Sequence, residues 1–292
     1  MKPARFHYYD PSTIEDAVGL LGRREDARPI AGGQSLVPMM NFRYATPAHI
    51  IDLNGIASLS TMNVREEITI GAMTRQREIE FSAEIARLCP ILQEALLNVG
   101  HRQTRNRGTI GGSLCHLDPA AELPAILLLH DATLQATSTV GRRDIAMSDF
   151  STGYMCNALE PGDLLTSVSF KAWGLNHGYA FEEYARRHGD FAIASVGALI
   201  EIDQQDKIKR LALVVGGLGN APSRLTAIER SSTGNIVSEE LIGAIAHEAS
   251  EVKAMDDAHV SAVYRQHLAS VLADRAMRRA VERARERLSA HV

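Results

Sequence analysis

Apolar side chains along the chain follow two different spacings. Between residues 78 and 99 they return every three or four positions, which predicts helix, and Pro90 is expected to divide this stretch into two helices. A short helix is predicted over residues 11–23, where Ser12 or Thr13 can cap the first turn. Segments rich in β-branched residues predict strands at 49–53, 66–73, 132–139, 164–170, 193–202 and 209–217. The apolar segment 121–129 fits either a buried helix or a buried strand.

The last predicted element is a long amphipathic helix over residues 264–288. Its apolar residues fall on one side and most of its arginines lie elsewhere, which is typical of a helix packed on its own domain. Asp274, Glu282 and Glu286 intersperse the positive charge and favour this interpretation. Binding of nucleic acid or of a partner through the basic face is the alternative.

Length and composition narrow the class of protein. A chain of 292 residues fits two or three domains of roughly 100–200 residues, and the segment 171–178, with the only tryptophan and two glycines, predicts a boundary near residue 175. With 31 basic and 35 acidic side chains, the overall charge does not favour nucleic-acid binding. The three scattered cysteines indicate a reducing compartment, and no apolar run suits a signal peptide or a membrane span. We therefore expect a cytoplasmic protein.

Several common catalytic signatures are absent from the sequence. It contains no GxxxxGK[ST], GxSxG, HExxH or CxxC motif, so neither a phosphate loop, a serine hydrolase nor a zinc site of these types is predicted. Ser113 follows two glycines, but Cys115 stands where the closing glycine of a GxSxG elbow would be. Gly217 and Gly219 follow a predicted strand, yet Pro222 replaces the third glycine of a dinucleotide fingerprint. A tight turn between strands is the preferred interpretation there.

Two glycine motifs remain, AGGQS at residues 31–35 and TIGGS at residues 109–113. Each follows an apolar stretch, and Pro38 prevents a long helix from starting directly after the first. Glycine pairs allow positive φ and close approach to a ligand, so that successive backbone N–H groups can converge on phosphate oxygens. One such motif alone would more simply be a hairpin or a helix cap. Two together favour a diphosphate, with one hydrogen bond added by each of Ser35 and Ser113.

Two carboxylates follow the second motif. Asp118 and Glu122 would repel phosphate, but a carboxylate readily accepts hydrogen bonds from ribose or ribityl hydroxyls. The combination therefore suits a dinucleotide that carries a sugar-like chain. The alternative makes Asp118 a turn residue before Pro119 and Glu122 an ordinary surface acid.

AGGQSLVPMMNFR, followed some seventy residues later by RNRGTIGGSLCHLDPAAELP, resembles the flavin-binding subunit of the molybdenum hydroxylases, the xanthine dehydrogenase family. As a free-standing chain of this length, it is organised like the medium subunit of aerobic carbon monoxide dehydrogenase. The similarity continues through RRHGDFAIASVGALIEI to the arginine-rich last helix. It implies an α+β fold: a PCMH-type FAD-binding domain at 1–175, in subdomains of about 1–56 and 57–175, then a C-terminal domain at 176–292 of antiparallel sheet plus helical bundle.

The resemblance also implies which residues contact FAD. The family's first motif wraps the diphosphate and the second holds it from the other side. Glu122 matches a position that contacts the polyol chain of the flavin, Asp118 lies beside it, and Phe191 matches an aromatic residue that approaches the isoalloxazine ring. The resemblance implies no catalytic residue and no metal site in this chain. The matching motif residues are Ala31, Gly32, Gly33, Gln34, Ser35 and Leu36, and then Thr109, Ile110, Gly111, Gly112 and Ser113.

The implied activity is electron transfer within a larger enzyme. FAD would take electrons from a partner chain that carries a [2Fe–2S] cluster and release them to an external acceptor, while a further chain bears the molybdenum cofactor, in a heterohexamer. Three scattered cysteines cannot supply the four thiolates that such a cluster normally takes. One alternative is a stand-alone FAD-dependent oxidoreductase with its catalytic base among His101, Arg102, His116 and His188. A nucleotide-binding regulatory or RNA-binding protein is another, resting only on the basic tail.

Overall fold

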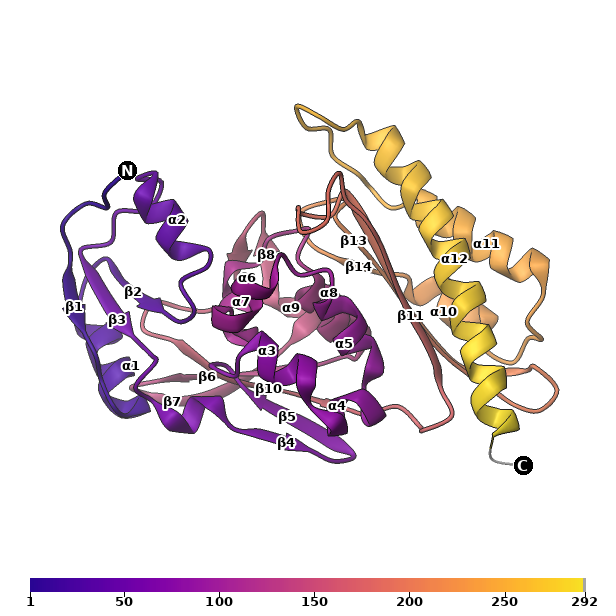
Figure 1. The fold of residues 1–292 in the computed structure, drawn as a ribbon, viewed down its shortest axis with the longest axis horizontal. Helices are drawn as coiled ribbons and strands as arrows, with labels where there is room; N and C mark the ends of the chain where they lie inside the picture. The colour runs from indigo at the N-terminus through magenta and orange to yellow at the C-terminus, as the bar shows by residue number, and fades with distance from the viewer. Residues whose placement is uncertain (291–292) are drawn as a thin grey trace.

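The N-terminal region is a small parallel sheet with one helix packed against it. The computed structural model describes residues 1–290, and Figure 1 shows this region at the left. The predicted first helix is confirmed: Thr13 caps it by accepting a hydrogen bond from the backbone N–H of Asp16 at 3.1 Å. The strands lie in the order β1-β3-β2. The elements are β1 (His7–Tyr9), α1 (Ile14–Arg23), β2 (Ala27–Ile30), α2 (Leu36–Asn41) and β3 (His49–Asp52).

The central region is a five-stranded antiparallel sheet in the order β4-β5-β10-β6-β7. Side chains on one face of this sheet, among them Ile70, Leu134 and Val168, are fully buried against the helices that follow β5. The predicted strands in this region are confirmed. Their bounds, with two small accessory elements and a short hairpin, are η1 (Ala57–Ser60), β4 (Met62–Val64), β5 (Glu67–Gly71), β6 (Thr133–Ser138), β7 (Gly141–Ala146), α9 (Met147–Phe150), β8 (Ser151–Gly153), β9 (Cys156–Asn157) and β10 (Leu164–Lys171).

Six short helices cover this sheet, and they correct the prediction for residues 78–99. That stretch forms three helices, not two, because the backbone leaves helical geometry at Ser82 and the Ser82 hydroxyl caps a new helix by accepting from Ile85 N–H at 3.2 Å. Pro90 begins the third, where a missing N–H costs nothing. The segment 121–129 is a helix, buried on nearly every side. The six helices are α3 (Gln76–Phe81), α4 (Ala83–Leu88), α5 (Pro90–Leu96), α6 (Arg102–Arg107), α7 (Ile110–His116) and α8 (Glu122–Leu129).

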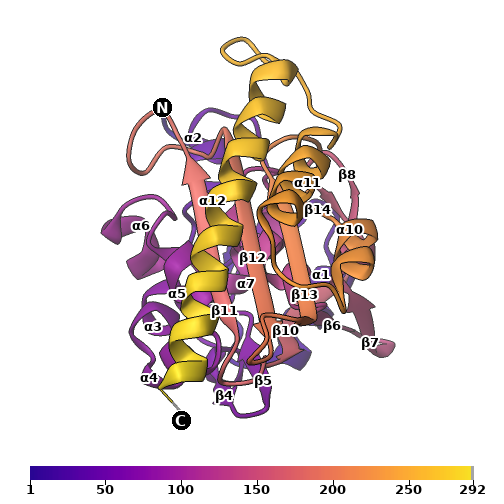
Figure 2. The same ribbon diagram turned by 90° about the vertical axis from the view of Figure 1, so that its right-hand side faces the viewer.

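The C-terminal region is a four-stranded antiparallel sheet with helices on its outer face, as Figure 2 shows. The long helix crosses β11 so closely that a Cβ at Gly178 would lie 1.8 Å from the carbonyl oxygen of Ala280. Gly217, at φ +80°, forms the predicted turn after β13. The elements are β11 (Gly178–Tyr184), β12 (Ala194–Ile202), β13 (Ile208–Gly216), β14 (Ser223–Arg224), α10 (Thr226–Ser232), α11 (Glu239–Ser250) and α12 (Ala262–Ser289). This architecture confirms the α+β class.

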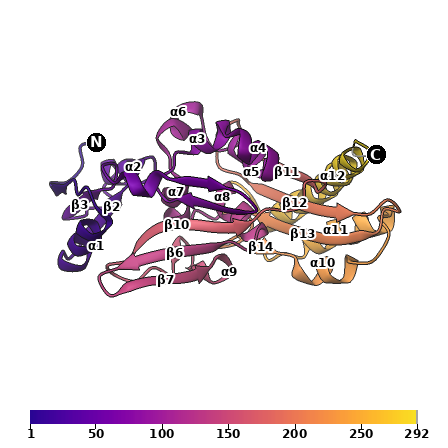
Figure 3. The same cartoon turned by 90° about the horizontal axis from the view of Figure 1, so that it is seen from below.

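The four-stranded sheet belongs to two hydrophobic cores. Its outer face, including Val196 and Leu213, packs with α11 and α12, while its inner face, including Phe181 and Leu199, joins the core of the central region. Figure 3 shows this sheet between the helices α12 and α8. The predicted boundary near residue 175 therefore separates segments of sequence that share one core in space.

Ion pairs attach α12 to the rest of the chain. Arg283 Nη1 donates to Glu94 Oε2 of α5 and to the carbonyl of Tyr179, both at 2.7 Å, while Glu94 Oε1 accepts from Phe181 N–H at 2.9 Å. Arg278 pairs with Glu239, and other arginines of the helix pair with Glu182 and Asp206. The predicted amphipathic helix is confirmed, and several of the arginines behind the nucleic-acid alternative have partners within the protein.

Of the helices within residues 1–290, none has both the length and the apolar character needed to cross a membrane.

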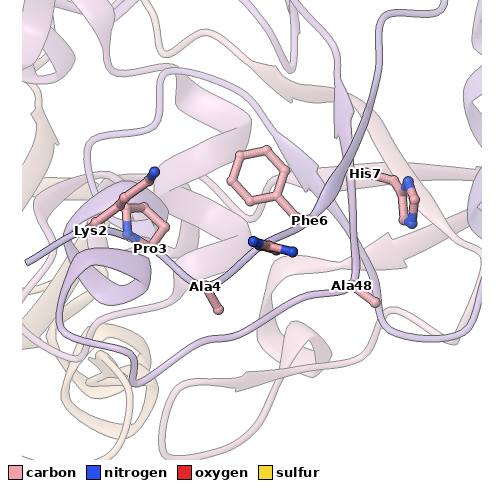
Figure 4. Close-up of a pocket in the computed structure, with 7 residues that line it drawn as sticks. Lys2, Pro3, Ala4, Phe6, His7 and Ala48 are labelled. Carbon is pink, nitrogen blue, oxygen red and sulfur yellow. The ribbon is translucent and has the colours of Figure 1, made fainter.

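An open hollow of about 740 Å³ lies under the N-terminal segment, lined by Lys2, Phe6 and Ala48 among others (Figure 4). No residue that lines this hollow belongs to either glycine motif.

Candidate functional site

The first glycine motif packs against the backbone that leads into the second. A Cβ at Gly32 would lie 2.0 Å from the carbonyl oxygen of Arg107 and 2.9 Å from the Cα of Gly108, so glycine is required at this contact. A Cβ at Gly112 would lie 3.7 Å from the Cβ of Ala31. The structure therefore brings together two segments that are more than seventy residues apart in sequence.

A partly buried arginine, Arg75, connects the two segments. Arg75, just before α3, donates one hydrogen bond to the carbonyl of Arg107 and another to the side-chain oxygen of Asn54. Asn54 in turn donates to the carbonyl of Ala31 at 3.1 Å. Burial, and then the charge of Arg107, lower the pKa of Arg75. Neither Arg75 nor Asn54 was identified from the sequence, because a lone arginine and a turn asparagine carry no signal that their partners lie at two distant motifs.

The first motif presents unused backbone donors. Gly33 has φ +73°, which turns the chain between β2 and α2. Within residues 1–290, the N–H groups of Gly32, Gly33, Gln34 and Ser35 donate no hydrogen bond, and Leu36 begins the six-residue helix α2. The Gln34 side chain donates back to the carbonyl of Gly32 at 3.1 Å, and the Ser35 hydroxyl makes no capping bond. Successive free N–H groups of this kind form a nest for an anion.

The second motif is a helix start and not a loop, which corrects the sequence prediction. Thr109 is the N-cap of α7, and its hydroxyl accepts from Gly112 N–H at 3.0 Å. Ile110 and Gly111 donate their N–H groups to the carbonyls of Thr74 and Ala72, and Ser113 donates to Thr109. These donors already have partners in the chain, and of the four glycines in the two motifs only Gly33 has positive φ. Gly111 instead serves close packing, since its Cβ would lie 2.7 Å from the Ala72 carbonyl.

The two carboxylates have different environments. Asp118 Oδ1 accepts from Ala120 N–H at 2.9 Å, which is the turn geometry considered as its alternative role. Glu122 is the first residue of α8 and is only 7% exposed, so it is not an ordinary surface acid. Burial, with the neighbouring charge of Glu183 on β11, raises the pKa of Glu122 to about 8.

Phe191 lies on the β11–β12 loop and is 68% exposed, which leaves its ring free to contact a ligand. A hollow of about 160 Å³ opens beside this loop, lined by Asn98 from the central region and by Glu183, Ala185, Arg187, His188 and Gly189 from the C-terminal region. The rings of His101 and His188 stack across the same junction at 6.2 Å. This hollow therefore draws on both halves of the chain.

These features fit FAD. Free N–H groups at the first glycine motif suit the diphosphate, a buried acid suits the hydroxyls of the polyol chain, and an exposed aromatic ring suits the isoalloxazine. The fit differs from the prediction in one respect. Only the first motif has backbone N–H groups that are free to bind phosphate, whereas the N–H groups of Ile110 to Ser113 already bind acceptors within the chain.

Comparison with known proteins agrees with this fit. Residues 4–173 match the family model described as the FAD binding domain in molybdopterin dehydrogenase, and residues 179–280 match that of the CO dehydrogenase flavoprotein C-terminal domain. The 6-hydroxypseudooxynicotine dehydrogenase complex subunit alpha of Paenarthrobacter nicotinovorans is 38% identical over 98% of this chain and 97% of its own length. The carbon monoxide dehydrogenase medium chain of Afipia carboxidovorans is 35% identical over 98% and 99%.

A solved structure, reconstituted CO dehydrogenase from Oligotropha carboxidovorans, superimposes with a TM-score of 0.94 at 34% identity, over 97% of this chain and 100% of the matched chain. Both halves of the fold, and not the glycine motifs alone, are therefore shared. The chain belongs to the FAD-binding subunits of the molybdenum hydroxylase family.

Proposed function

We propose that this subunit transfers electrons from an iron–sulfur partner chain, through its FAD, to an external acceptor, in a complex whose third chain bears the molybdenum cofactor. The family match over both halves of the chain carries this proposal, and the free N–H groups of Gly32, Gly33, Gln34 and Ser35 beside the second motif support a bound diphosphate. FAD supplies the redox chemistry, since flavin accepts electrons singly or in pairs. The residues of the chain bind and orient it.

We assign each candidate residue a part in binding. The free N–H groups of Gly32–Ser35 hold the diphosphate, and the start of α7 limits how far it can move. The buried carboxyl of Glu122 binds the polyol chain, and the exposed ring of Phe191 lies against the isoalloxazine. Asp118 positions the turn that leads into α8.

The number and burial of the cysteines support the proposal that a partner chain holds the [2Fe–2S] clusters. The chain has three cysteines in all, fewer than the four thiolates that a [2Fe–2S] cluster normally takes. Cys89 is fully buried, and burial raises its pKa to about 12, which disfavours the thiolate needed for ligation. All three cysteines are free thiols, which supports a cytoplasmic location.

Purification of the chain with and without its genomic neighbours tests the function. We expect a yellow chain whose flavin, released on denaturation, is FAD, and we expect two partner chains to copurify, one with iron–sulfur clusters and one with molybdenum. Reduction of the FAD should occur only when substrate is added to the whole complex. Rapid oxidation of an organic substrate by the isolated chain would contradict the proposal and support a stand-alone oxidoreductase.

A further inference from the structure

Three successive peptide groups of the first glycine motif have a bound carbonyl and, within residues 1–290, a free N–H group. In a trans peptide the C=O and the N–H point in opposite directions, so a hydrogen bond to the carbonyl also fixes where the N–H points. The same bond polarises the peptide group and makes its N–H a stronger donor. The carbonyls are those of Ala31, Gly32 and Gly33, and their donors are Asn54 Nδ2, Gln34 Nε2 and the Val37 N–H, each at 3.1 Å.

The first of these peptide groups is connected to a cation. Arg75 Nη2 donates to Asn54 Oδ1, and Asn54 Nδ2 donates to the Ala31 carbonyl. That carbonyl belongs to the same peptide group as the free N–H of Gly32. Every donor in this series points away from the guanidinium and toward the free N–H, so each hydrogen bond strengthens the next.

The contacts of Asn54 leave its amide a single orientation, although the residue is exposed. Arginine can only donate, so the amide oxygen must face Arg75. The two hydrogens of the amide nitrogen go to the Ala31 carbonyl and to Asp52 Oδ1, which also accepts from the Asn54 backbone N–H at 2.9 Å. The other carboxylate oxygen of Asp52 accepts from the Tyr8 hydroxyl. Asn54 is therefore a fixed link between Arg75 and the first motif.

Arg75 also lies close to Gly32 in space. Its Nη1 atom donates to the Arg107 carbonyl oxygen, and a Cβ on Gly32 would lie 2.0 Å from this same oxygen. The main chain of Arg75 pairs with Thr109, the first residue of the second motif. One residue therefore contacts the backbone of the second motif and, through Asn54, orients a peptide group of the first.

We propose that Arg75 and Asn54 are positioning residues for the FAD diphosphate, and that their relay of hydrogen bonds aims the Gly32 N–H at a phosphate and strengthens it as a donor. This inference rests on the assignment of the diphosphate to the first motif in the proposed function. Arg75 acts through Asn54 and the Ala31–Gly32 peptide group, and it needs no contact of its own with the cofactor.

Reconstitution of the flavin-free chain with FAD, followed by flavin fluorescence, tests the relay. Loss of a hydrogen bond to a charged group changes a binding constant by about 10- to 100-fold, so we expect Arg75→Gln to weaken FAD binding by about that factor. Arg77→Gln is the matched control, because it removes the same charge from α3 while Arg77 pairs with Glu80 and lies over the ring of Phe81. Wild-type affinity in Arg75→Gln, or an equal loss in Arg77→Gln, would overturn the proposal.

Asn54→Ala distinguishes a relay from two separate effects. If Arg75 acts through Asn54, then Arg75→Gln should weaken FAD binding by less than about twofold once Asn54 is alanine. An undiminished loss in the double variant would mean that Arg75 acts independently of Asn54, and would refute the relay.

Phosphorus NMR of the bound cofactor separates positioning from a general effect on the fold. At saturating FAD we expect Arg75→Gln to shift the diphosphate resonances, because a phosphate oxygen loses a strong donor, whereas Arg77→Gln should leave them unchanged. Urea denaturation of the same variants without flavin measures their stability. Wild-type resonances together with lower stability in Arg75→Gln would show that Arg75 supports only the fold. None of these measurements involves a partner chain, so a failure here is distinct from a failure of the proposed electron transfer.

Discussion

Replacement of Gly32 by alanine should push the first glycine motif away from Arg107 and Gly108, the residues that lead into the second motif. The added methyl would lie 2.0 Å from the Arg107 carbonyl oxygen, whereas an ordinary contact is 3.4 Å or more, so the backbones must move apart by about 1.4 Å. Neither neighbour can rotate away, because both contacting groups are backbone. The displaced segment carries the free N–H groups that we assign to the diphosphate.

The size of the effect follows from this displacement. A misplacement of about 1 Å at a binding site commonly costs about 10²-fold, so we expect FAD affinity to fall by about that factor. Crowding at the contact should also destabilise the fold by about 1–3 kcal/mol.

Reconstitution of the flavin-free chain, followed by flavin fluorescence, measures the affinity, and chemical denaturation measures the stability. Gly243→Ala is the matched control, because Gly243 lies inside α11 with nothing within 4 Å of an added methyl. That variant should keep its FAD affinity and gain about 0.5–1 kcal/mol of stability. Wild-type affinity and stability in Gly32→Ala would refute the contact between the motifs.

Three other changes give distinct readouts. Glu122 keeps its proton up to about pH 8 in the folded state but loses it near pH 4.5 when the chain is unfolded. The free energy of unfolding should therefore fall as pH rises across this range. Urea denaturation at several pH values should show a smaller fall in Glu122→Gln. Glu94→Gln weakens the ion pair with Arg283 that joins α5 to α12, and should cost about 1–3 kcal/mol by the same method. Thr109→Val removes the cap of α7 and should lower thermal stability by about 1 kcal/mol and weaken FAD binding, measured by melting and by flavin content.

Each of these expectations has a contrary outcome. A wild-type pH profile in Glu122→Gln would mean that Glu122 ionises as readily in the folded as in the unfolded chain. An unchanged free energy of unfolding in Glu94→Gln would show that hydrophobic burial, without this ion pair, holds α5 and α12 together. Full stability and full flavin content in Thr109→Val would mean that the threonine hydroxyl contributes neither to the stability of α7 nor to FAD binding.

The sequence predicted the fold well where one local signal dominated. The long helix α12 was visible from its spacing of apolar residues, and α1 from its cap at Thr13. The turn at Gly217 followed from the mismatch to a dinucleotide fingerprint. Both glycine motifs were identified, and the structure places them in contact.

The remaining features depend on contacts that sequence does not encode locally. TIGGS forms a helix start because Thr109 caps it and the backbones of Ala72 and Thr74 accept its first N–H groups, and those acceptors lie some forty residues earlier. Glu183 looks in the sequence like one of several acids on β11, and only the fold shows that its Oε2 atom is buried. Phe191 is exposed, but its proposed contact with the ring stays a prediction.

The sheet β11–β14, which has one face in each of two hydrophobic cores, supports the loop whose aromatic ring we assign to the flavin. The loop that carries Phe191 joins two strands of this sheet, and one face of the sheet shares a core with α7 and α8. In the proposed electron transfer, a flavin ring held beside this loop would keep one separation from its donor, on which the rate of electron transfer depends steeply. The docking of the partner chains, and not motion within this chain, would then set that rate.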